Sequence, residues 1–151
     1  MTTVFDQHQI IRQNAFDLIS KFSDEQIHKI PTGFKNNLIW NFGHMIVTQH
    51  ILTFGLSNLS LLIDNDIISK YRKGSSPLIE AFGNTTEELQ KISINLIEET
   101  KIAYNQNKFT NFNKYETSFK VTLNNIEDAL AFNNIHEGLH LGYMMALSKN
   151  L

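Results

Sequence analysis

Apolar side chains recur every three to four residues over four stretches of this chain, which is the spacing that places them on one face of an α-helix. In the third stretch, for example, Leu89, Ile92, Leu96 and Ala103 follow this period. We therefore expect four long helices, over residues 3–22, from 36 or 37 to about 57, from 85 to 104 and over 126–147. No segment alternates convincingly between apolar and polar residues, so the pattern predicts an all-α helical bundle.

Capping signals support these boundaries and add short helices in the connections. Ser23-Asp24-Glu25-Gln26 and Thr85-Thr86-Glu87-Glu88 both match the capping box, in which two side chains satisfy free backbone amides at a helix start. The first predicts a short helix that Pro31 interrupts, and a second short helix is expected near residues 63–71. Asn124 or Asn125 is predicted to cap the last helix.

Residues 105–123 differ from the rest of the chain. They are rich in asparagine and aromatic residues and show no helical period. A long irregular segment in a compact domain is usually functional or packed over something. Two roles stay open for it: it covers a functional pocket, or it closes one end of the bundle.

Composition and charge limit the partners. At 151 residues the chain fits one domain, residues 1–151, and it contains no cysteine, which excludes disulfides and thiolate metal sites. The net charge is -2 without a basic run, so we expect no nucleic-acid partner. Apolar runs are too short to span a bilayer and the N-terminus lacks the features of a secretory signal, so we expect no membrane partner and a cytoplasmic location.

The most informative motif is His136-Glu137-Gly138-Leu139-His140, which reads H-E-x-x-H. On a helix the two histidines lie about one turn apart on one face, which suits a single divalent ion, and zinc peptidases use the glutamate as a general base. Six histidines in this length would give such a pair by chance roughly one time in five, and two histidines in a polar seam are the plain alternative. Two ligands also do not complete a site, because zinc sites need three or four.

A zinc peptidase is not supported. The third ligand of those enzymes follows the motif, either as a glutamate well downstream or as a histidine six residues on. Here Ala146 stands six residues after His140, and no Asp, Glu or His follows His140 at all. The strand that would hold a peptide beside the helix is also missing from the pattern.

The third ligand must therefore come from upstream. Of the four other histidines, His28 is expected at the surface and His8 near one end of the bundle. His44 shares a face with inward-pointing apolar residues and follows Gly43, which lets a helix or ligand approach closely. His44 is the best candidate, with His50 second, and a core histidine with an ordinary hydrogen-bond partner is the alternative for either.

Trp40-Asn41-Phe42-Gly43-His44 together with His136-Glu137-Gly138-Leu139-His140-Leu141-Gly142 resembles the DinB superfamily over nearly the whole chain. The resemblance implies an up-down-down-up four-helix bundle with short additional helices in the connections. It also implies a divalent metal site made by His44, His136 and His140, and a homodimer. Several members of the superfamily are transferases or isomerases that use a low-molecular-weight thiol such as bacillithiol or mycothiol.

Two classes of function follow. Three imidazoles leave coordination positions open, as in catalytic metal sites, and zinc, nickel or ferrous iron would each accept them. The first class is a metal-dependent thiol transferase of the bacillithiol type, with that thiol as substrate. The second is a non-catalytic metal-bound bundle. For Glu137 we expect a structural role or one beside the metal ligands, and Gly138 and Gly142 predict that another helix packs closely against the last one.

Overall fold

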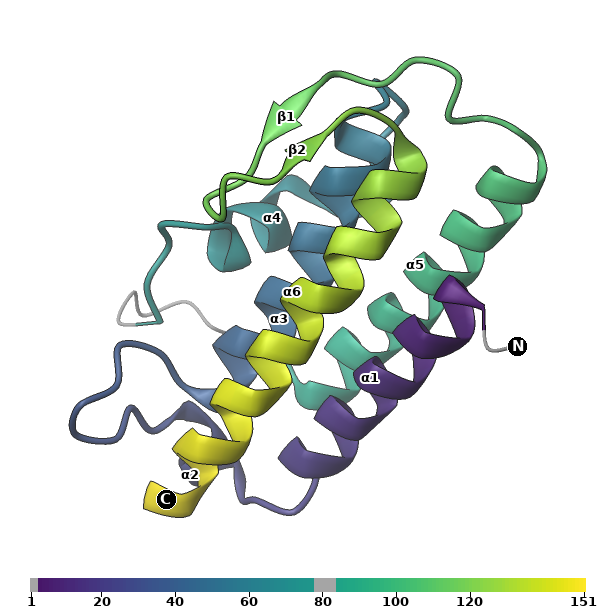
Figure 1. Cartoon of the computed structure of the whole chain (residues 1–151). Coiled ribbons are helices and arrows are strands. Elements are labelled where there is room, and N and C mark those ends of the chain that lie inside the picture. The colour runs from purple at the N-terminus through teal and green to yellow at the C-terminus, as the bar shows by residue number, and fades with distance from the viewer. Residues whose placement is uncertain (1–2, 78–83) are drawn as a thin grey trace.

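Four long helices form the body of the protein, as a computed structural model shows; it describes residues 3–77 and 84–151. They are α1 (Val4–Ile19), α3 (Leu38–His50), α5 (Thr86–Asn105) and α6 (Ile126–Leu147). In Figure 1, α1 and α6 run in one direction, and α3 and α5 run in the other. The predicted all-α up-down-down-up bundle is therefore confirmed.

Side-chain caps set the helix starts, at Ser23, Thr85 and Asn125 as the sequence predicts and at Thr3 in addition. Thr3, Ser23 and Thr85 each accept a hydrogen bond from the third residue of their helix and complete a capping box. Asn37 caps α3 and Asn125 caps α6. The two short helices that the sequence predicts are α2 (Asp24–His28) and α4 (Asn65–Tyr71), and both lie in connections.

The end of α3 differs from the prediction. The α-helix stops at His50 and continues as one turn of π-helix, η1 (Ile51–Gly55), in which the Leu56 amide donates to the Ile51 carbonyl at 2.9 Å. The Thr53 hydroxyl donates to the Gln49 carbonyl at 2.8 Å, across the junction of α3 and η1. Such turns are often found at functional sites.

Residues 105–123, which are expected to be irregular, contain a small β-hairpin. Strands β1 (Tyr115–Glu116) and β2 (Thr122–Leu123) pair antiparallel. Each strand has only two residues, which is too short to produce an alternating pattern. The turn is closed by the Thr117 amide, which donates to the Val121 carbonyl at 2.9 Å. The chain ends in a short 3-10 helix, η2 (Ser148–Asn150).

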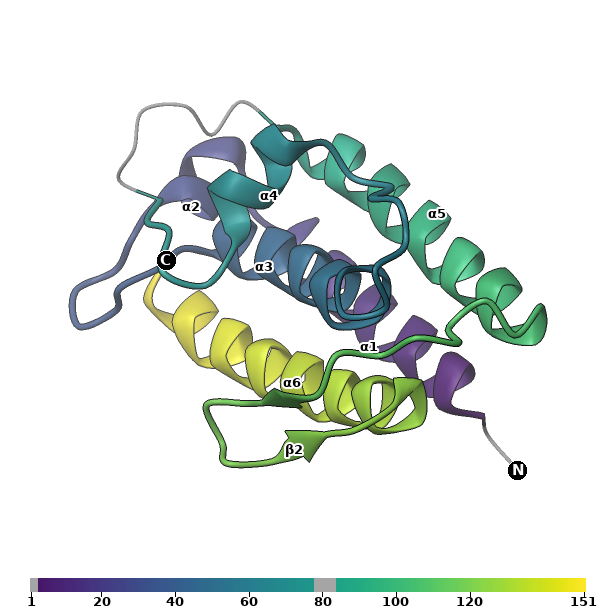
Figure 2. The ribbon, with the colours of Figure 1, turned by 90° about the horizontal axis from the view of Figure 1, so that it is seen from above.

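The core is divided into two clusters. The larger one lies between the four helices and includes Ile19, Phe42 and Leu96. The smaller one lies under the hairpin and joins Phe5, Leu123 and Phe132. Figure 2 shows the hairpin beside α6, on the side away from α5. Among the described residues, no helix is long and apolar enough to cross a membrane.

The prediction that another helix packs closely against the two glycines of α6 is wrong within this chain. Gly138 and Gly142 lie on the outer face of α6, and a Cβ atom on either would meet nothing within 4 Å in the described structure. No helix of the same chain therefore packs closely against them. Three large side chains of this face are also exposed: Ile135 by 63%, Leu139 by 50% and Met145 by 54%.

Candidate metal centre

Three histidines from two helices meet inside the bundle. His44 comes from α3, and His136 and His140 come from successive turns of α6. One ring nitrogen of each lies within 4.8 Å of one ring nitrogen of the other two. The structure thus brings together the three residues that the sequence predicts, and the group could hold a metal ion.

A close helix contact positions His44. Gly43 has no side chain, and the Tyr71 ring at the end of α4 occupies the space that a Cβ would need. This approach places the Tyr71 carbonyl 2.7 Å from His44 Nδ1. The Trp40 indole stacks on the imidazole, with ring centroids 4.7 Å apart and planes 9° apart. His44 is therefore held by a backbone acceptor and an aromatic face.

His140 is held by a chain of two asparagines. Its Nδ1 lies 2.9 Å from Asn41 Oδ1. Asn41 donates through Nδ2 to the Asn37 carbonyl at 2.7 Å, so its oxygen must face the histidine. Asn37 in turn caps α3 and donates to the His28 carbonyl at 2.8 Å. The start of α3 thus fixes the orientation of a ligand candidate on α6.

These contacts determine the proton positions on two rings. Carbonyl and amide oxygens only accept hydrogen bonds, so Nδ1 carries the proton on both His44 and His140. Nε2 of each ring is then unprotonated and has a lone pair for a metal. A hydrogen bond from the second ring nitrogen to a fixed acceptor is the usual arrangement in histidine metal sites.

The electrostatics keep the three rings neutral. Burial lowers the pKa of His136 to about 4, with a further contribution from His44. Burial and the neighbouring His136 lower the pKa of His140 to about 3. Burial also lowers the pKa of His44. His136 Nδ1 is buried and finds no hydrogen-bond partner among the described residues. A set of neutral nitrogens, one of them unpaired, fits a divalent transition metal.

The other histidines lie elsewhere. His50, the second candidate for the third ligand, is fully buried, and its Nε2 accepts a hydrogen bond from the Leu62 amide at 3.0 Å. His28 is partly exposed and contacts the Asp24 carbonyl, close to the surface position that the sequence predicts. His8 is only 2% exposed and lies in the bundle interior rather than at its end.

Glu137 points away from the three histidines into a buried ion-pair network. Its carboxylate accepts hydrogen bonds from Arg12 and from Asn133 Nδ2, and it lies 2.8 Å from His8 Nε2. Burial raises the pKa of Glu137, but Arg12 and His8 outweigh this effect and hold it at about 2. The expected structural role of Glu137 agrees with this geometry. A base like the peptidase glutamate would need a carboxylate facing the metal site.

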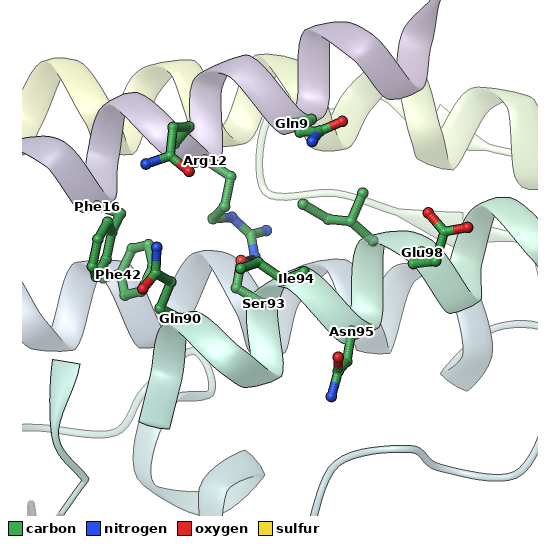
Figure 3. A pocket seen from close by; sticks show the side chains of 11 residues that line it. Gln9, Arg12, Phe16, Phe42, Gln90, Ser93, Ile94, Asn95 and Glu98 are labelled. Atoms are coloured by element: carbon green, nitrogen blue, oxygen red, sulfur yellow. Dashed lines mark hydrogen bonds between the residues drawn. The ribbon is translucent and has the colours of Figure 1, made fainter. Parts of the chain in front are cut away.

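Arg12 connects this network to α5. Its Nη1 donates to the Ser93 hydroxyl at 2.9 Å, and Figure 3 shows the guanidinium extending from α1 toward α5. It lines a cleft of about 320 Å³ between the two helices, which contains none of the three histidines. Sequence reasoning did not identify Arg12, although it shares a helix face with Phe5, His8 and Ile19. An arginine on the buried face of a helix indicates, from the sequence alone, that a charged or polar group is buried beside it.

Two cavities reach the histidine group. The smaller, of about 150 Å³, is lined by His44, His136 and a mainly apolar wall from η1, α6 and the hairpin. The wider, more open cleft, of about 560 Å³, is lined by His140, Asn41, Lys35 and Tyr143, among others. Tyr115, Thr117 and Ser118 line the small cavity, and Phe119 lines the cleft.

Both roles left open for residues 105–123 are therefore present. The hairpin half covers the histidines, as the cavity walls show. The earlier half packs on the bundle: the Phe109 ring contacts Phe54, and Phe112 packs against the smaller core cluster.

One of the comparisons with known proteins identifies a family. A family model described as the DinB superfamily matches residues 7–144, which is most of the chain. None of the curated proteins compared with the chain matches it.

Proposed function

The chain belongs to the DinB superfamily, and from this membership and its histidine group we propose that it is a metal-dependent thiol transferase. His44, His136 and His140 hold one divalent transition ion, and a low-molecular-weight thiol of the bacillithiol type is transferred to an electrophile. The observation that carries this proposal is the group of three neutral imidazoles, two of them oriented by fixed acceptors, beside two cavities.

The metal's contribution would be to lower the pKa of a thiol that binds it, which provides a nucleophile near neutral pH. The protein's contribution is geometric. The Tyr71 carbonyl and the Asn41 amide fix the ring planes of His44 and His140 and leave the Nε2 lone pair of each for a metal. Three protein ligands leave at least one coordination position for the thiol. Zinc, nickel and ferrous iron all suit this donor set.

Metal analysis and a transfer assay test the proposal. Purified protein should contain about one transition-metal ion per chain, and His140→Ala should lose most of it. His28→Ala is the matched control, because His28 lies outside the group. With bacillithiol and an alkylating electrophile, the wild-type protein and His28→Ala should form the conjugate at equal rates. Equal rates in the wild-type protein and His140→Ala would contradict the transferase proposal.

A non-catalytic metal-bound bundle is the second candidate, and one feature favours it. His44 on α3 and the pair on α6 belong to different helices, so an ion between them would cross-link the bundle. A ligand that binds only the folded state at 100 times its Kd adds about 2.7 kcal/mol of stability. Metal binding and stabilisation of this size, without conjugate formation, would support this second function.

A homodimer through the outer face of α6 is part of the proposal, as is a cytoplasmic location, where small thiols stay reduced. The exposed residues Ile135, Leu139 and Met145 lie with Gly138 and Gly142 within about 120° of the helix circumference. The two glycines would allow the partner's helix to approach closely. Ile135→Glu should turn a dimer into a monomer in sedimentation experiments, and a wild-type monomer would contradict this part.

A further inference from the structure

The three histidines are reached by two cavities of different size, and we propose that each takes one substrate. The apolar body of the electrophile lies in the small cavity beside His44 and His136, and the thiol lies in the open cleft beside His140. This assignment rests on the proposed thiol transfer and specifies the electrophile as one that carries a single small apolar group.

The small cavity has the lining of an apolar binding site. Ile51, Leu52 and Leu56 form one wall, and Phe132 forms another. Polar groups of the lining include the Thr48 hydroxyl, which lies 3.3 Å from His44 Nε2, and the side chain of the exposed residue Lys73. In another protein an apolar cavity of about 150 Å³ binds one benzene molecule, so one ring or a branched alkyl group of similar size is the upper limit here.

The open cleft suits the thiol. By the same measure, a benzene molecule uses about 25 Å³ of cavity per heavy atom, so a cleft of about 560 Å³ accommodates roughly 20 heavy atoms. That is the size of a small thiol built from a sugar or a peptide, which the small cavity cannot hold. Asn36, Asn41 and Tyr143 provide hydrogen-bonding groups, and the exposed Lys35 provides a positive charge for a carboxylate.

The hairpin turn keeps the two substrates apart. Thr117 and Ser118 line the small cavity, whereas the next residue, Phe119, lines the cleft. The Phe119 ring lies 6.1 Å from the Phe132 ring, centroid to centroid, so the turn is packed against α6 between the two spaces. Members of the histidine group line both spaces, so this group is where the two substrates would meet.

The reaction that this arrangement supports is a substitution. The thiol loses its proton to water in the open cleft, and its sulfur forms a bond to the electrophilic carbon. The bond from that carbon to the leaving group breaks at the same time, and the leaving group departs with the electron pair. One thioether and the anion of the leaving group are formed, the proton stays with water, and no oxidant or reductant is involved.

The first test measures binding without turnover. Benzyl alcohol, added to the purified protein, should bind in the small cavity, as followed by ligand-observed NMR. Ile51→Trp should weaken this binding at least tenfold, because Ile51 lines the cavity and its 37% exposure leaves room for a larger side chain. Lys35→Trp, which narrows the cleft, is the matched control and should change benzyl alcohol binding less than twofold. Equal effects of the two substitutions would overturn the assignment.

A second measurement needs no variant. Wild-type protein should bind 2-naphthylmethanol at least tenfold more weakly than benzyl alcohol, because two fused rings exceed the cavity. Equal binding of the two alcohols would overturn the size limit even if Ile51→Trp failed to fold.

The transfer assay then separates this inference from the proposed function. The ratio of conjugation rates for benzyl bromide and methyl iodide should fall about tenfold in Ile51→Trp, whereas Lys35→Trp should raise the KM for the thiol and leave that ratio unchanged. Transfer that proceeds with an unchanged ratio in Ile51→Trp contradicts the cavity assignment alone. No transfer by the wild-type protein, with benzyl alcohol still bound, contradicts the proposed function instead.

Discussion

The Tyr71 ring lies directly against the backbone of Gly43, in the space that any larger residue at position 43 would fill with its Cβ. This contact brings the Tyr71 carbonyl to His44 Nδ1 at 2.7 Å. Gly43 therefore affects the histidine group through Tyr71, because the absence of a side chain at position 43 leaves room for the Tyr71 ring.

Gly43→Ala should weaken metal binding by about 10- to 100-fold, because Tyr71 must move and its carbonyl then leaves His44. The measurement is the metal Kd from competition with a chelator. Gly55→Ala is the matched control, since a Cβ there would make only ordinary contacts of 3.8 Å or more. If both variants bind metal like the wild-type protein, the contact with Tyr71 does not position His44.

Asn41→Leu should also weaken metal binding by about tenfold or more. It preserves the size of the side chain but removes the acceptor that orients His140 and the donor to the Asn37 carbonyl. Asn150→Leu near the C-terminus is the control. Metal Kd should change in the first variant alone. A loss of helicity without a change in Kd would instead assign Asn41 to the stability of α3.

Most of the fold follows from local signals. Apolar periodicity and the capping residues Thr3, Ser23, Thr85 and Asn125 act within a few residues of one another, so they can be recognised in the sequence and they place the helices correctly. The π-helical turn and the hairpin were not predicted. Two-residue strands carry no periodic pattern, and a π-turn depends on how the chain packs around it.

The candidate site could likewise be predicted only in part: the histidines could be, and the groups that orient them could not. His136 and His140 are visible from their spacing on one helix, and His44 from its apolar neighbours together with the family resemblance. The groups that orient them are not visible, because they depend on tertiary contacts. Tyr71 acts through its backbone carbonyl, 27 residues from His44, and the contact between Asn41 and His140 spans 99 residues.

Glu137→Gln should lower the free energy of unfolding by about 3–5 kcal/mol, because it leaves the buried Arg12 without its charged partner. Urea denaturation at pH 7 measures this loss. Glu99→Gln, at an exposed position of α5, should cost less than about 0.5 kcal/mol. Replacing both partners, as in Arg12→Met with Glu137→Leu, should recover part of the stability. Loss of metal without loss of stability would show that Glu137 acts at the metal site after all.

His50 should make the stability of the protein depend on pH. Burial lowers its pKa to about 4 in the folded protein, against 6.5 for an ordinary histidine. Above pH 6.5 the ring is neutral in both states, and stability is unaffected. As the pH falls from about 6.5 to about 4, the unfolded chain binds a proton that the folded protein excludes, so up to about 3 kcal/mol of stability is lost.

His50→Gln retains an acceptor for the Leu62 amide but cannot bind this proton. The stability difference between metal-free wild-type protein and this variant, measured by urea denaturation at pH 7 and pH 4.5, isolates the effect, because the histidines of the metal site titrate equally in both. An unchanged difference across these two pH values would show that His50 is not held neutral by its burial beside η1.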